Sequence, residues 1–111
     1  MFGQSVKEVD AHEFAKWVND ANHNMRVIDV RGMEEIAMGT LPKAEALPLH
    51  TLSAKMQDLS RDEKLVMVCR SGARSAQACM FLQQQGFTNV LNLRGGMMGW
   101  AQSGFPVHQL A

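Results

Sequence analysis

The sequence predicts an α/β domain in which helices cover both faces of a central parallel sheet of about five strands. Short apolar segments alternate with segments of helical periodicity along the whole chain, which is typical of repeated strand–helix–strand units. The length of 111 residues suits one domain, and no repeat, low-complexity tract or linker divides it. We therefore interpret residues 1–111 as a single domain with its core at about 6–107.

The amino-terminal half is predicted to contain three strands and three helical segments. Asp10 followed by Glu13 is typical of a capping box that begins a helix. Four apolar residues then recur at helical spacing and are predicted to face the core: Phe14, Trp17, Val18 and Ala21. The predicted strands are residues 6–9, 26–30 and 45–49, with Pro48 near the end of the third. The other helical segments are residues 34–38, which Gly39 ends, and residues 52–59.

The carboxy-terminal half is predicted to contain the strongest strand, at residues 64–68, which is short, apolar and β-branched. A loop of small residues and arginines follows at 70–74. Residues 75–85 are predicted to be a helix that Gly86 ends. A strand at 89–93 and a last short helix after the segment GGMMGW complete the domain.

The composition excludes several classes of protein. Two cysteines cannot form a disulfide framework, and four scattered histidines show no zinc-ligand spacing, so no metal site is predicted. The apolar runs are too short to span a bilayer, and the first ten residues do not resemble a signal peptide. We therefore expect a cytoplasmic protein that binds neither membrane nor nucleic acid, since its net charge is zero.

The charges are unevenly distributed along the chain. Residues 1–63 contain all 11 acidic residues and seven basic ones, a net charge of −4. Residues 64–111 contain four basic residues and no acidic one, a net charge of +4. The partition has two interpretations: chance in a small protein, or a positive pocket that attracts a small anion.

The loop after the strongest strand is the candidate site. Cys69 ends that strand, and ligands of open α/β sheets bind beyond the carboxyl ends of strands. A strand-to-helix loop directs backbone N–H groups and a helix N-terminus to one point, which suits an anion. Gly72 permits a tight turn, the small Ser71 and Ala73 leave the amides accessible, and two arginines, Arg70 and Arg74, add positive charge. A thiol there is expected to have a pKa below its free value of ~8.5.

The alternative for Cys69 is a buried small apolar residue at a strand end. Cys79 illustrates that alternative, because it lies in the middle of a predicted helix with no charge cluster around it. We interpret Cys79 as core packing and Cys69 as a reactive thiol.

The segment VMVCRSGARSAQACMFLQQQGFTNVLNLRGGMMGW resembles the rhodanese-like single-domain sulfurtransferases, the thiosulfate sulfurtransferase family. The shared features are an apolar strand, a reactive cysteine that opens a short loop, a helix ending near Gly-Phe, a Val-x-x-Leu strand and a Gly-Gly-x-x-x-Trp segment. Upstream, VIDVRGMEEIAMG resembles the family's Asp-Val-Arg, Glu and Gly segment. The resemblance covers about residues 6–107 and implies a rhodanese-like fold.

The chain departs from the family pattern at two places. The family usually has His-Ile-Pro-Gly-Ala where this chain has Thr40-Leu41-Pro42-Lys43-Ala44, so the His and the Gly are missing and the local turn is in question. An aromatic residue usually follows the glutamate, and here it is Ile36.

The resemblance implies transfer of sulfane sulfur through a persulfide on Cys69, with no metal or organic cofactor. The donor is a small anion such as thiosulfate or a persulfide, and the acceptor is a thiol or cyanide, with a sulfur-carrier protein as a further partner. The backbone of residues 70–74 would hold the anion, with Arg70 on the sulfonate end of the donor and Arg74 closing the loop. The supporting residues are expected to be Asp29, Arg31, Glu35 and Ser75, with Glu35 as a partner of Arg31.

Three other functions stay open at this point. A protein-to-protein sulfur-relay carrier would use the same Cys69 but needs a docking face. A non-enzymatic rhodanese-like module commonly lacks the cysteine. A cysteine phosphatase or arsenate reductase is disfavoured, because only four residues separate Cys69 from Arg74 where phosphatases have five, and no acidic residue follows Glu63.

Overall fold

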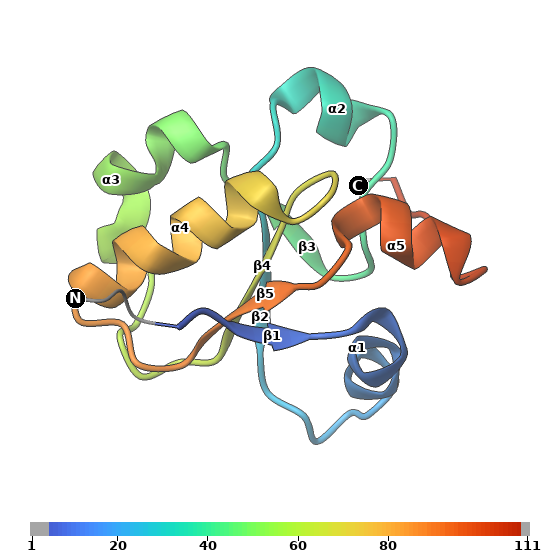
Figure 1. The fold of residues 1–111 in the computed structure, drawn as a ribbon, viewed down its shortest axis with the longest axis horizontal. Coiled ribbons are helices and arrows are strands. Elements are labelled where there is room, and N and C mark those ends of the chain that lie inside the picture. Colours follow the sequence, from blue (N-terminus) through green and yellow to red (C-terminus); the bar gives the residue numbers. More distant parts are fainter. Residues whose placement is uncertain (1–4, 110–111) are drawn as a thin grey trace.

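The computed structural model describes residues 5–109, which form a parallel sheet with helices on both faces (Figure 1). The five strands are β1 (Lys7–Val9), β2 (Arg26–Asp29), β3 (Ala44–Ala46), β4 (Leu65–Val68) and β5 (Val90–Leu93). They lie in the order β1-β5-β4-β2-β3, and every neighbouring pair is parallel. The predicted fold class is confirmed.

The central strand β4 shows why both faces of the sheet are covered. Its four residues are all buried, and successive side chains point to opposite faces. Leu65 and Met67 join the core beneath α3 (Leu52–Lys55) and α4 (Ala73–Gln84). Val66 and Val68 join the core beneath α1 (Ala11–Val18) and α5 (Gly96–Gln102), which Figure 1 shows on the other side of the sheet. An unbroken apolar run is therefore what a strand between two helical layers requires.

The first helix is shorter than predicted. Asp10 accepts a hydrogen bond from the Glu13 backbone N–H at 2.8 Å, as an N-cap should. The Glu13 side chain instead accepts from the Trp17 indole at 3.1 Å, so only half of the capping box forms. Because α1 ends at Val18, Ala21 lies beyond it and is exposed, and its assignment to the core stripe was wrong.

The connections between β2 and β4 are built from short pieces. The turn after β2 is the five-residue helix α2 (Met33–Ala37). The predicted helix at 52–59 is only α3, flanked by the 3₁₀ turns η1 (Leu49–Thr51) and η2 (Met56–Asp58). β3 ends two residues before Pro48, consistent with a residue that cannot donate to a ladder.

The two family residues that the chain lacks are replaced in different ways. Thr40, where the family has His, is buried and donates through its hydroxyl to Asp29 Oδ2 at 2.6 Å. Lys43, where the family has Gly, adopts a left-handed backbone with φ of 67°. The turn thus keeps a conformation that favours glycine, although a lysine occupies it.

None of the helices described between residues 5 and 109 is both long and apolar enough to cross a membrane.

Candidate active site

Cys69 lies directly after β4, at the end of the sheet where the chain turns into α4. Its sulfur accepts a hydrogen bond from the Gly72 backbone N–H at 3.0 Å, and the Ser75 hydroxyl lies 3.3 Å away. The turn is tight because Gly72 adopts a φ of 111°. Cys69 itself is 1% exposed, so the thiol lies within the loop rather than on the surface.

The surroundings of Cys69 favour its anion. Burial opposes ionisation, but hydrogen bonds outweigh it and lower the pKa of the Cys69 thiol from its ordinary value. The donors are the Ser75 hydroxyl and the backbone N–H groups of Ser75, Gly72 and Ser71. Ala73 is the first residue of α4, so only residues 70–72 form the loop and residues 73–75 already belong to the first turn of the helix. The sequence-based expectation of a lowered pKa therefore agrees with the geometry.

The start of α5 holds the other side of the loop. The backbone N–H groups of Met97 and Met98 donate to the carbonyls of Cys69 and Arg70 at 2.9 and 3.0 Å. Gly96 touches the same two carbonyls so closely that a Cβ there would overlap them. The second glycine of the Gly-Gly segment is therefore explained by the close approach of α5 to the cysteine loop.

Sequence reasoning missed Asn92. This residue is 2% exposed and lies in β5 beside the loop. Its amide donates to the Gly72 carbonyl at 3.1 Å, and its oxygen contacts the Ser75 hydroxyl. One polar residue at an inward position of the apolar strand VLNL was the available signal, because a buried amide requires partners.

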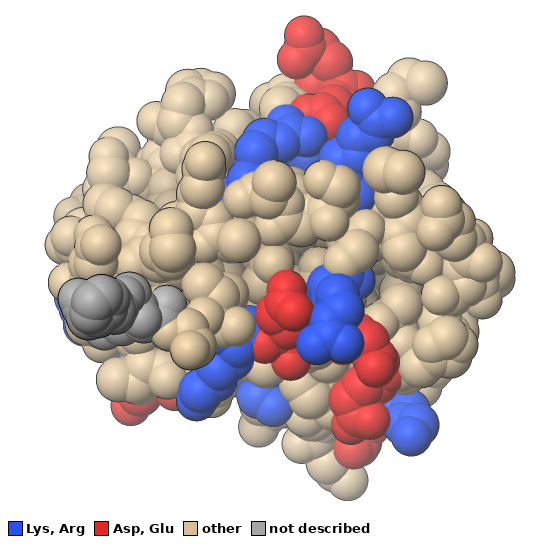
Figure 2. All heavy atoms as spheres, viewed as in Figure 1, with Lys and Arg blue, Asp and Glu red and all other residues tan. Residues whose placement is uncertain are grey.

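Arg74 is held by α2. Its guanidinium forms a two-point ion pair with Glu35, at 2.7 and 2.9 Å. Figure 2 shows basic and acidic side chains meeting at the end of the molecule where α2 lies in Figure 1. The expected pairing of Glu35 with Arg31 was wrong, because Arg74 occupies the Glu35 carboxylate.

Asp29 and Arg31 form a buried ion pair beside the cysteine loop. Asp29 is 0% exposed and accepts from Arg31 at 2.8 Å, and Arg31 also donates to the Gly39 carbonyl at 2.6 Å. The Val30 N–H donates to the Val68 carbonyl, which places this pair next to Cys69. The pair joins the end of β2 to the turn after α2.

Arg70 stands at the edge of an open apolar groove. The groove has a volume of about 450 Å³, and several of its lining side chains are exposed apolar ones. Met38 is 81% exposed, Val107 47% and Met98 44%. Arg70 lines this groove, and within residues 5–109 it makes no ion pair.

Cys79 is as buried as Cys69, but within residues 5–109 no hydrogen bond lowers the pKa of its thiol. It lies inside α4, fully buried in the core on that face of the sheet. Burial raises the pKa of the Cys79 thiol to about 12. The interpretation of Cys79 as core packing is confirmed.

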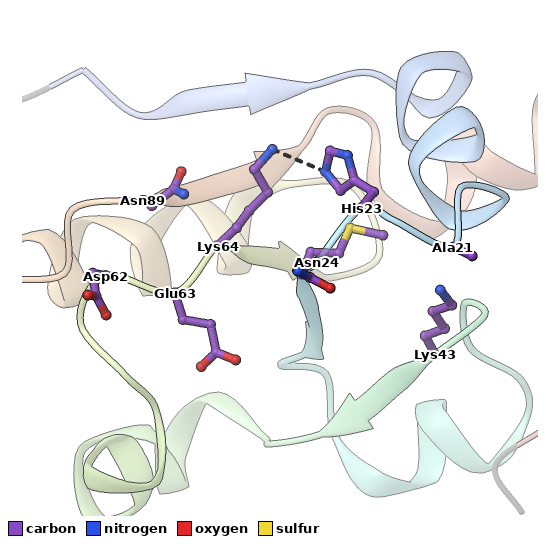
Figure 3. A pocket seen from close by; sticks show the side chains of 9 residues that line it. Ala21, His23, Asn24, Lys43, Asp62, Glu63, Lys64 and Asn89 are labelled. Atoms are coloured by element: carbon purple, nitrogen blue, oxygen red, sulfur yellow. Dashed lines mark hydrogen bonds between the residues drawn. The ribbon is translucent and has the colours of Figure 1, made fainter.

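A second cavity lies at the opposite end of the sheet, where the strands begin. Its volume is about 690 Å³, and Figure 3 shows side chains of both charges around it, including Lys43, Lys64 and Glu63. Lys64 contacts His23 at 3.1 Å there. This cavity contains no cysteine, and within the described part of the chain no cluster of metal-ligating side chains is present.

The fold and the loop define an α/β domain with a buried, hydrogen-bonded cysteine at the carboxyl end of its central strand. The family model for the rhodanese-like domain matches residues 10–103, and the chain belongs to that family. A sulfurtransferase of Allochromatium vinosum is 42% identical over 92% of this chain and 94% of its own length. The thiosulfate sulfurtransferase GlpE of Actinobacillus pleuropneumoniae is 25% identical over 94% of both chains.

Solved structures agree with the family assignment. The crystal structure of a rhodanese-related protein from Thermoplasma volcanium matches with a TM-score of 0.81 and 31% identity. The match covers 91% of this chain and 96% of the other. Sulfur transfer is thus supported for this chain at the level of its family.

Proposed function

We propose that this protein transfers sulfane sulfur from a thiosulfate-like anion or a persulfide to a thiol or cyanide, through a persulfide on Cys69. The proposal rests on the hydrogen bonds to the Cys69 sulfur. They favour the thiolate, and the thiolate is the nucleophile that such a reaction needs. Both cysteines are free thiols, which is why we also propose a reducing, cytoplasmic setting.

The proposed reaction has two displacements. The Cys69 thiolate attacks the outer sulfur of thiosulfate, the S–S bond breaks, and sulfite leaves with the bonding electrons. Cys69 then carries a terminal anionic sulfur. An acceptor thiolate or cyanide attacks that sulfur, takes it, and regenerates the Cys69 thiolate. No step requires a metal or an organic cofactor.

The loop stabilises charge throughout this sequence. The backbone N–H groups of residues 71, 72 and 75 are already directed at the sulfur before reaction. Such preorganised donors stabilise an anion without reorganisation during the reaction. Because Cys69 is 1% exposed, reactants that present a single terminal sulfur atom fit the site best.

Intact mass spectrometry tests the proposal. The protein is treated with thiosulfate, desalted and measured under non-reducing conditions, together with Cys69→Ser and the matched control Cys79→Ser. We expect a gain of one sulfur atom in the wild type and in Cys79→Ser, removable by cyanide, and none in Cys69→Ser. Failure to load from both thiosulfate and a persulfidated donor protein would refute the sulfurtransferase proposal.

A sulfur-relay carrier is the second candidate, and the apolar groove beside Arg70 favours it. A small anion such as thiosulfate gains nothing from the exposed methionines of this groove. Protein partners, in contrast, bind to adaptable apolar surfaces of this kind. For a relay, replacing Met38 and Met98 by Ser should slow transfer to protein acceptors far more than transfer to cyanide. The control is Met80→Ser, because Met80 lies on α4, is as exposed as Met98 and does not line the groove.

A further inference from the structure

The orientation of the Asn92 amide is fixed by its neighbours. The amide nitrogen lies 3.1 Å from the Gly72 carbonyl oxygen and 3.4 Å from a carboxylate oxygen of Glu8. Both oxygens are acceptors only, so the NH₂ group must face them. The Asn92 oxygen therefore faces the Ser75 hydroxyl, and that oxygen can only accept.

The Ser75 hydroxyl has one hydrogen and two neighbours that can accept it, Asn92 Oδ1 and Cys69 Sγ. While Cys69 is a thiol, Asn92 is the stronger acceptor, and the Cys69 S–H can donate to a lone pair of the Ser75 oxygen. Once Cys69 is an anion, it can only accept, and its charge makes it the stronger acceptor. The hydroxyl must then turn from Asn92 toward the sulfur.

We propose that Asn92 is a positioning residue for the Ser75 hydroxyl. While Cys69 is a thiol, the Ser75 hydroxyl donates to Asn92 Oδ1; when Cys69 becomes an anion, the hydroxyl donates to the sulfur instead. The proton that Cys69 loses goes to solvent, and the O–H bond of Ser75 does not break. Only the hydroxyl rotates, so no oxidation, reduction or proton transfer from Ser75 is involved. The inference rests on the proposed function only in assigning the sulfur anion to catalysis.

Asn92 acts on the Cys69 anion in two opposing ways. Its oxygen competes with the sulfur for the Ser75 hydrogen, which disfavours the anion. Its nitrogen holds the Gly72 carbonyl and so keeps the Gly72 N–H on the sulfur, which favours the anion. The first effect requires the Ser75 hydroxyl and the second does not, and this difference makes the two effects separable.

The charged groups around the loop stay the same in this comparison. They come from β1, from the end of β2, from α2 and from the loop with α4: Glu8, Asp29, Arg31, Glu35, Arg70 and Arg74.

A double-mutant cycle read out by alkylation tests the proposal. The rate of iodoacetamide reaction at Cys69 is measured against pH in the wild type, Asn92→Leu, Ser75→Ala and the double variant, with peptide mass spectrometry to locate the adduct. The quantity compared is the change that Asn92→Leu makes in the ionisation constant of the Cys69 thiol. We expect this change to favour the thiolate ~3–10-fold more with Ser75 in place than in the Ser75→Ala background. An equal effect of Asn92→Leu in both backgrounds would overturn the proposal, because it would leave only the structural role through Gly72.

A second measurement does not depend on replacing a buried residue by a larger apolar one. The side-chain carbonyl carbon of Asn92 is followed by NMR while Cys69 is titrated, in the wild type and in Ser75→Ala. We expect the resonance to move markedly in the wild type and several-fold less in Ser75→Ala. Equal movement in both would overturn the proposal.

Neither measurement uses a sulfur donor. A Ser75-dependent effect without persulfide loading would remove the proposed function and leave the hydroxyl rotation standing. Persulfide loading without a Ser75-dependent effect would remove the rotation and leave the proposed function standing.

Discussion

At Cys69, burial and hydrogen bonding act on the pKa of the thiol in opposite directions. Burial raises the pKa of a thiol, as Cys79 shows in the same protein, where burial and, to a smaller extent, the Glu8 charge raise it to about 12. At Cys69 four donors from the loop and the first turn of α4 reverse the result and lower the pKa. The reactivity that we assign to Cys69 therefore comes from hydrogen bonds, since both cysteines are buried.

Arg70 is the residue whose charge should matter most to a small anionic donor. It is exposed beside the loop and forms no ion pair within residues 5–109, whereas Arg74 is held by Glu35. We expect Arg70→Ala to raise the KM for thiosulfate ~10-fold, the effect of about 1.4 kcal/mol of binding. Steady-state kinetics measure this, with Lys16→Ala on α1 as the charge-matched control. An unchanged KM would assign Arg70 to the solvent or to a protein partner.

Lys43 carries a backbone cost that glycine would not. Its φ of 67° places a side chain in the left-handed region, which costs an L-residue roughly 1–2 kcal/mol. Replacing Lys43 by glycine would remove this cost, but the larger entropy of glycine in the unfolded state offsets part of the stabilisation. We expect Lys43→Gly to raise the free energy of unfolding by about 0.5–1 kcal/mol, measured in urea. Lys43→Ala keeps the unfavourable φ and should not be stabilised; equal gains in both variants would contradict the argument.

At the scale of elements, local patterns predicted what local physics determines. The apolar run at β4, the Asp10 cap and the turn at Gly72 follow from neighbouring residues, and all three are present. Asn92 and the Glu35–Arg74 ion pair were missed because their partners lie far away in the sequence. Local periodicity also predicted one helix for residues 52–59, whereas the structure has the short helix α3 followed by the 3₁₀ turn η2.

The ion pair between α2 and α4 makes stability depend on pH. Hydrogen bonds from Arg74 hold the pKa of Glu35 at about 2, below its ordinary 4.5. Because the folded-state pKa is the lower one, the pair stabilises the protein above pH 4.5, and this contribution is lost as the pH falls toward 2. The Glu35 side chain is 36% exposed, so screening limits the contribution to about 1 kcal/mol.

Replacing Glu35 by Gln tests this linkage. Urea unfolding between pH 2.5 and 6 should show Glu35→Gln about 1 kcal/mol less stable than the wild type at pH 6, with the difference shrinking as the pH falls. In an Arg74→Ala background, the same substitution should have a smaller pH-dependent effect, because only the Gly32 N–H and the Arg31 charge still favour the Glu35 carboxylate. A constant difference across the pH range would mean that Arg74 does not stabilise the Glu35 charge.

At the scale of the whole molecule, the folded chain brings its acidic and basic halves together. Arg74 pairs with Glu35, and Arg94 pairs with Glu8, each across the two halves. Two of the four basic residues after position 63 are therefore neutralised by carboxylates from the first half. Of the positive pocket that the charge distribution suggested, the backbone N–H groups and Arg70 are what remains near the cysteine loop.

The carboxy-terminal segment is fastened to the support of the site by two backbone hydrogen bonds. Thr40 and His108 exchange N–H to carbonyl bonds, both at 2.7 Å, and Thr40 also holds Asp29 through its hydroxyl. His108→Pro removes the N–H that donates to the Thr40 carbonyl, whereas His108→Ala removes only an exposed side chain.

We expect His108→Pro to lower the free energy of unfolding by about 1–3 kcal/mol and His108→Ala by less than about 0.5 kcal/mol. Denaturant unfolding of the two variants measures the difference. The effect should reach the site as well, because Thr40 joins this bridge to the buried Asp29–Arg31 pair next to Cys69. Equal stability of the two variants would mean that the bridge adds nothing, and that Asp29 and Arg31 hold the turn after α2 without help from the end of the chain.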